Sequence, residues 1–109
     1  ETLRRFAHNF KGLLSENLKR RLTVENDDKG GLYTIAELMP LHEATGIPLT
    51  FDFFHHKLYS GGMEEREAFE LAVSTWPKDV TPVCHYSDSR REYEDPAAKR
   101  EAHSDWVYN

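Results

Sequence analysis

The sequence predicts an α/β fold in which about three βα units hold their strands in parallel. Three short apolar or β-branched runs, at residues 22–25, 49–52 and 82–85, end on Glu25, Asp52 and His85. Polar or helix-forming sequence follows each run, which is typical of a strand followed by a helix. The runs begin 27 and then 33 residues apart, and this spacing leaves room for the crossover helices that parallel strands require.

The opening stretch predicts an amphipathic helix. Leu3, Phe6, Phe10 and Leu13 recur every three or four residues and so share one face of a helix. We expect this face to pack on the sheet, and Ser15 to cap one further turn before the first strand.

A second helix is expected between the first two strands. Thr34 and Glu37 form a capping-box pattern at its start, and Gly46 suits the left-handed position past its end. Pro40 lies inside this pattern without a backbone donor, so we expect a kink or a helix that effectively starts later.

A third helix is expected after the glycine pair at residues 61–62, before the third strand. The charged, proline-interrupted stretch at residues 88–101 has no periodicity and predicts a long surface loop.

Length and composition indicate one small segment. The chain has 109 residues and a formal charge of −5, with a mean hydropathy of −0.72. No apolar stretch approaches the roughly 20 residues that span a bilayer, and we expect no membrane partner. The single cysteine, Cys84, excludes an internal disulfide and fits a reducing intracellular compartment such as the cytoplasm or nucleoid. The chain begins inside a helical pattern, without an initiator Met, and we expect it to be an excerpt of something longer.

Five side chains are candidate metal ligands. The carboxyl ends of parallel strands open onto one face, so Glu25, Asp52 and His85 are expected to converge there. His55 follows Asp52 by three residues, and His103 would come from the loop beyond the third strand. Carboxylate oxygens and imidazole nitrogens suit hard or intermediate divalent ions, and five ligands are enough for more than one ion.

Structural interpretations compete with this one. Asp52 is equally well placed to cap a following helix. Residues 26–28 (Asn-Asp-Asp) fit a solvated turn, or hydrogen bonds that orient the ligands from outside. His8 and His42 fit helix surfaces, and His56 is expected to point away from its neighbour because side chains alternate in extended chain.

Four segments resemble the UV damage endonucleases, whose fold is a TIM barrel related to the endonuclease IV group. The matching segments are residues 21–28 (RLTVENDD), 46–56 (GIPLTFDFFHH), 85–87 (HYS) and 103–105 (HSD). The resemblance covers residues 21 to 106. It implies a partial (β/α)8 barrel, with residues 1–109 as a single segment from the C-terminal portion, holding about the fifth to seventh βα units.

The resemblance also implies a site and a reaction. Carried over by position, Glu25 bridges metal ions, and Asp52, His55, His85 and His103 bind them, with Glu25, Asp52 and His85 as the catalytic set. It implies divalent ions, usually Mn²⁺, and hydrolysis of damaged double-stranded DNA immediately 5′ of a UV photolesion. Clustered divalent ions would bind the phosphate, activate a water and stabilise the leaving 3′ oxygen.

The chain departs from the family pattern at Val83, where the family often has a lysine that is carboxylated in some members. The histidine ligands and lesion-probing residues of the barrel's first half, and a final glutamate ligand, lie outside the chain. We therefore expect the chain alone to be inactive, and the parent protein to be a DNA repair endonuclease.

Two other functions remain open at this point. A metal-dependent sugar isomerase or epimerase on a similar barrel also uses strand-end Glu, Asp and His ligands. A non-catalytic half-barrel could instead associate with itself through exposed sheet edges. The basic residues near the site are candidate phosphate contacts: Arg90, Arg91, Lys99 and Arg100.

Overall fold

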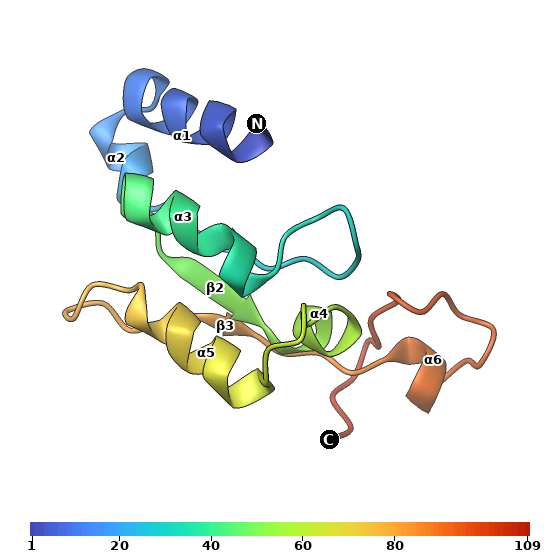
Figure 1. Cartoon of the computed structure of the whole chain (residues 1–109). Helices are drawn as coiled ribbons and strands as arrows, with labels where there is room; N and C mark the ends of the chain where they lie inside the picture. Colours follow the sequence, from blue (N-terminus) through green and yellow to red (C-terminus); the bar gives the residue numbers. More distant parts are fainter.

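The computed structural model describes residues 1–109 and contains one three-stranded parallel sheet with helices packed against it (Figure 1). The strands are β1 (Val24–Glu25), β2 (Leu49–Asp52) and β3 (Cys84–His85), in the order β1-β2-β3. Both neighbouring pairs run parallel. The prediction of an α/β fold with three parallel strands is confirmed, and each strand ends on the expected residue.

Helices connect and flank these strands. They are α1 (Thr2–Leu13), α2 (Glu16–Lys19), α3 (Ile35–Thr45), α4 (Phe53–Leu58), α5 (Glu65–Ser74) and α6 (Arg90–Tyr93). None of them combines the length and the apolar composition that crossing a bilayer requires.

The core lies between β2 and the two longer helices that pack on it, α3 and α5. Leu49 and Phe51 are buried in this core, and they alternate along β2 with Thr50 and Asp52, which therefore face the other side of the sheet. The buried cluster consists of Ile35, Leu38, Leu41, Leu49, Phe51, Ala68 and Ala72. The helix layer thus covers one face of the sheet and leaves the second face to the polar strand residues.

The first helix packs against α3 rather than mainly on the sheet, contrary to the prediction (Figure 1). Phe10 of α1 is buried, and Leu3 and Ala7 contact the edge of the core. The amphipathic pattern specified an apolar face, but it carried no information about which surface that face would cover.

The predicted helix ends are present. Ser15 caps α2 by accepting a hydrogen bond from Leu18 N at 3.3 Å, and Thr34 caps α3 by accepting one from Glu37 N at 3.3 Å. Gly46 ends α3 with a φ of 75°, in the left-handed region. The helix runs without interruption from Ile35 across Pro40, so the prediction of a helix that starts later is wrong.

Two short helices replace expected irregular structure. Residues 53–58, which include His56 where extended chain was expected, form α4, and α6 lies inside the expected surface loop with Ser89 as its N-cap. His56 consequently lies on a helix, and the extended-chain reason for its direction is wrong. Its ring is buried, with its centroid 5.3 Å from that of Phe51.

The central strand is tied at its start by side chains from the segment after α5. Thr75 Oγ1 accepts a hydrogen bond from Leu49 N at 2.8 Å, and Trp76 Nε1 donates one to Leu49 O at 2.8 Å. Since β1 and β3 are two residues long, these side chains satisfy backbone groups that a longer neighbouring strand would otherwise pair.

Candidate metal centre

The strand ends place their ligand-type side chains around one open cleft. Asp52 pairs with His85 across the β2–β3 ladder, and Glu25 pairs with Thr50 across β1–β2, so all project from the same sheet face. The cleft has a volume of about 450 Å³. Its lining residues are Glu25, Asp52, His55, Cys84, His85, Tyr86, Ser87 and His103, which include all five candidate ligands from the sequence.

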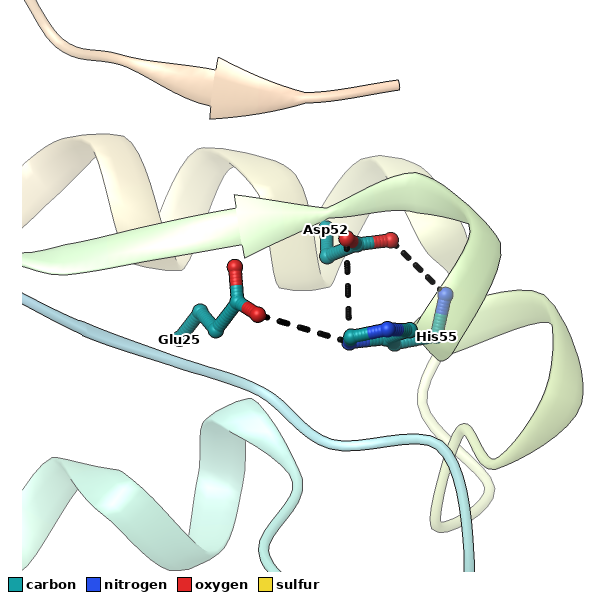
Figure 2. Close-up of side chains that lie close together, drawn as sticks. All are labelled: Glu25, Asp52 and His55. Carbon is teal, nitrogen blue, oxygen red and sulfur yellow. Dashed lines mark hydrogen bonds and ion pairs between the residues drawn. The ribbon is translucent and has the colours of Figure 1, made fainter. Parts of the chain in front are cut away.

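Asp52 uses its two carboxylate oxygens differently. Oδ1 accepts a hydrogen bond from the backbone N–H of His55 at 2.9 Å and so caps α4. Oδ2 lies 3.7 Å from Nδ1 of His55 and 3.8 Å from Nδ1 of His85. The helix-cap interpretation of Asp52 is therefore confirmed (Figure 2). The cap leaves the second oxygen free to face the two imidazoles.

Glu25 brings its carboxylate to the same histidines from β1. Its Oε1 lies 3.9 Å from Nδ1 of His55, and its Oε2 contacts Nδ1 of His85. Oε2 is shielded from solvent, and the His85 ring nitrogen is the group in contact with it. A buried carboxylate oxygen requires a donor or a cation beside it, so either the His85 ring or a bound metal ion would compensate its charge.

Three of the side chains satisfy the spacing of a shared ion. One ligand atom each from Glu25, Asp52 and His55 lies within 4.8 Å of the other two (Figure 2). Two ligands of one ion lie no further apart than about twice the metal–ligand distance, roughly 4–5 Å. The donor set, two carboxylates and an imidazole, is therefore able to hold a divalent cation at this spacing.

Two histidines reach the cleft from outside this group. The side chain of His85 is 56% exposed, whereas that of His55 is 12% exposed. His103 pairs with Ser89 in an isolated antiparallel bridge, and its Nδ1 lies 3.2 Å from Ser87 Oγ. Its ring centroid lies 5.6 Å from that of His55, so the segment after α6 brings a fifth donor to the cleft.

The residues of the Asn-Asp-Asp segment have two different structural roles. Asn26 is buried and its side chain bonds to the backbone of Asp52, as the outer hydrogen-bond interpretation requires. Asp27 instead accepts a hydrogen bond from the backbone of Asp28 at 2.9 Å, within the turn. The solvated-turn interpretation fits these two aspartates, and only Asn26 contacts the site.

Asp88 is a buried carboxylate that the sequence interpretation assigned to a surface loop. Its Oδ2 accepts backbone hydrogen bonds from Tyr108 at 2.6 Å and Asn109 at 3.0 Å. The Tyr108 bond, with smaller contributions from Asn109 and Tyr86, holds the pKa of Asp88 below its usual value. Its backbone carbonyl also accepts from Ser104 N at 2.8 Å, which anchors the segment that carries His103.

Half of the basic residues proposed for phosphate contact are already engaged. Arg90 forms ion pairs with Asp105 at 2.7 Å and Glu94 at 3.5 Å, and Arg100 donates to the carbonyl of Leu58 at 2.7 Å. Arg91 and Lys99 form no ion pair and remain available to a phosphate.

Val83 lies just before β3 and lines a second hollow together with Thr50 and His85. It is 53% exposed. The position where the resemblance implies a lysine therefore shares a surface with a candidate ligand, and the valine side chain supplies no ligand atom.

The chain is similar in sequence to proteins named as UV-damage endonucleases. It is 36% identical over 115 residues to the UV-damage endonuclease of Schizosaccharomyces pombe, covering 100% of this chain and 19% of that protein. It is 33% identical over 95 residues to the UV DNA damage endonuclease of Bacillus cereus strain B4264, covering 86% of this chain and 29% of that protein. The chain thus spans less than a third of the length of these relatives.

A solved structure shares the fold. The crystal structure of SacUVDE matches 97% of this chain with a TM-score of 0.81 and 32% identity, while the chain covers 33% of that structure. Together with the three parallel strands, this match identifies the fold as three βα units of an incomplete (β/α)8 barrel. The family model described as UV-endonuclease UvdE matches residues 1–109, and the chain belongs to that family.

Proposed function

We propose that the protein carrying this chain is a metal-dependent DNA repair endonuclease that hydrolyses the phosphodiester 5′ to UV photolesions. Residues 1–109 would form a single C-terminal segment of its barrel domain, inactive alone. The observation that carries the proposal is the convergence of five ligand-type side chains on one cleft in a member of the UvdE family. The names of the relatives in yeast and Bacillus supply the substrate class, UV-damaged DNA.

The proposed ligands are Glu25, Asp52, His55, His85 and His103, with divalent ions, Mn²⁺ first, as cofactor. When bound, such ions supply Lewis acidity toward a phosphate and lower the pKa of a bound water. The protein residues orient the donors: Asp52 is held by its cap bond to α4, and His103 by Ser87. We assign the catalytic set to Glu25, Asp52 and His85, which end the three strands.

Phosphate contact falls to the segment beyond β3. Arg91, Lys99 and Arg100 form no ion pair there, whereas Arg90 is paired with two carboxylates. Arg100 donates to the carbonyl of Leu58, so Arg91 and Lys99 are the freer of the three. These 109 residues have a formal charge of −5 and gain little from long-range attraction to DNA. Individual basic side chains beyond β3 are therefore expected to provide the phosphate contacts.

A nicking assay tests the proposal. UV-irradiated and unirradiated plasmid are incubated with Mn²⁺ and the complete natural polypeptide, its Glu25→Gln variant, or a Glu43→Gln control. Glu43 lies exposed on α3, away from the cleft. Damage-dependent nicking should survive in the control and disappear in Glu25→Gln. Absence of nicking by folded, metal-loaded protein would reject the endonuclease and favour the sugar isomerase or epimerase instead.

A further inference from the structure

Asn26 extends the β1–β2 pairing beyond the end of β1. Its Oδ1 accepts a hydrogen bond from Asp52 N at 2.7 Å, and its Nδ2 donates one to Asp52 O at 3.0 Å. The side chain is 1% exposed. A carboxamide is the one side-chain group that offers a donor and an acceptor side by side, as a peptide does, so it can satisfy both backbone groups of one residue.

The main chain of Asn26 contacts a second candidate ligand. Its carbonyl oxygen lies 2.8 Å from Nδ1 of His55. A carbonyl only accepts, so Nδ1 must carry the proton, and in the neutral ring the lone pair then lies on Nε2. Metal-binding histidines are commonly fixed in this way, with one ring nitrogen donating to a carbonyl and the other binding the ion.

We propose that Asn26 is a positioning residue for the metal centre. Its side chain fixes the backbone of Asp52, and its carbonyl sets the proton of His55 on Nδ1. The metal-dependent part of this inference rests on the proposed function above, whereas the proton position of His55 does not. Every hydrogen bond that the Asn26 side chain makes ends on Asp52. The side chain therefore acts directly on Asp52, and it acts on His55 only through the cap bond of Asp52 to α4.

A hydrogen bond at the other end of the same pairing gives a matched comparison. Thr50 Oγ1 of β2 donates to Thr23 Oγ1, just before β1, at 3.0 Å. This bond involves no hydrogen-bonding group of a proposed ligand. Its loss would weaken the cross-strand contact, whereas loss of the Asn26 bonds frees both backbone groups of Asp52.

The experiment compares Asn26→Asp and Asn26→Ala with Thr50→Val in the complete natural polypeptide. Asn26→Asp keeps the size of the side chain but loses the donor to Asp52 O and adds a buried charge. Mn²⁺ affinity by calorimetry should fall about 10–100-fold in the Asn26 variants, the usual effect of removing such a partner. It should change less than about twofold in Thr50→Val.

The second readout needs no metal. Imidazole ¹⁵N spectra of the metal-free protein, recorded on the alkaline side of the observed histidine titration, should show His55 protonated on Nδ1 in the wild type. That pattern should persist in the Asn26 variants, because they keep the backbone carbonyl that accepts from His55. The spectra therefore separate the role of the carbonyl from that of the side chain. His42 is the internal reference, because its Nδ1 lies 2.9 Å from the carbonyl of Ile47, far from Asn26 in sequence, and it should be unchanged.

The outcomes separate the two proposals. Protonation of His55 on Nε2 in the wild type would overturn the role of Asn26 even if no variant folds. Wild-type Mn²⁺ affinity in a folded Asn26→Asp protein would overturn it as well. Failure of the wild type to bind Mn²⁺ would instead reject the proposed function, while the spectra would still decide how Asn26 acts on His55.

Discussion

Asp52 and His55 are joined by two different contacts. The backbone N–H of His55 donates to Oδ1 of Asp52 at 2.9 Å, and its ring Nδ1 lies 3.7 Å from Oδ2 of the same carboxylate. The residue that starts helix α4 thus also faces the cleft. This arrangement makes the structural and the chemical functions of Asp52 separable by substitution.

Asp52→Asn should preserve the fold and abolish metal binding. Asparagine is as good an N-cap as aspartate, so α4 should persist, but the amide cannot supply the negative oxygen of the site. Asp52→Ala loses the cap as well and should lower the free energy of unfolding by about 0.5–2 kcal/mol. Thermal unfolding and Mn²⁺ titration of both variants check this. Equal Mn²⁺ affinity in Asp52→Asn and the wild type would show that Asp52 is only a cap.

Acid should release the segment that Asp88 anchors. Hydrogen bonds from Tyr108 and Asn109 hold the pKa of Asp88 below its usual value. The ionised form therefore stabilises the folded state, fully above about pH 4, the pKa expected when unfolded. This contribution should disappear as the pH falls through the lower folded-state pKa. Amide chemical shifts of Tyr108 and Asn109 between pH 6 and 2 measure it, and Asp88→Asn should remove the pH dependence. A transition well above pH 4 would contradict it.

Pro40→Ala should stabilise the chain without affecting the site. Pro40 lies in the interior of α3 and is exposed, so substitution restores a helical hydrogen bond and removes little packing. The free energy of unfolding in urea should rise by on the order of 1–3 kcal/mol. Mn²⁺ affinity should stay constant. A decrease in stability would mean that the restriction Pro40 imposes on the unfolded chain outweighs its cost in the helix.

Residues 1–109 alone should self-associate. β1 and β3 are the two edges of the sheet, and Val80 and Val83 are 44% and 53% exposed. Open edges and exposed apolar side chains favour pairing between chains. Sedimentation velocity should show an average mass that rises with concentration and decreases when Val80 and Val83 are both replaced by Lys. A monomer at all concentrations would reject self-association through these edges.

The sequence predicted the strand ends because their signals are local. A β-branched or apolar run followed by a polar ligand-type residue marks Glu25, Asp52 and His85 without any knowledge of packing. The capping residues Ser15 and Thr34 are equally local, since each contacts a backbone N–H three residues ahead. Parallel topology then brings the strand ends together, as the structure shows.

The missed features depend on distant partners or ambiguous composition. Asp88 receives its hydrogen bonds from residues 20 and 21 positions away, so nothing beside it in the sequence marks it as buried. Helix α4 begins with two aromatic residues, which are as typical of strands as of short helices. The one local sign was Asp52 itself, whose cap bond specifies the start of α4.

The bonds at the two ends of β2 also protect the strand from sliding. A shift of one residue would turn Phe51 into the cleft and move Asp52 into the helix layer, because successive side chains face opposite sides. Such a shift would break the Thr75 and Trp76 bonds at Leu49 together with both Asn26 bonds at Asp52. With flanking strands of only two residues each, side-chain hydrogen bonds at both ends of β2 thus contribute to holding its register.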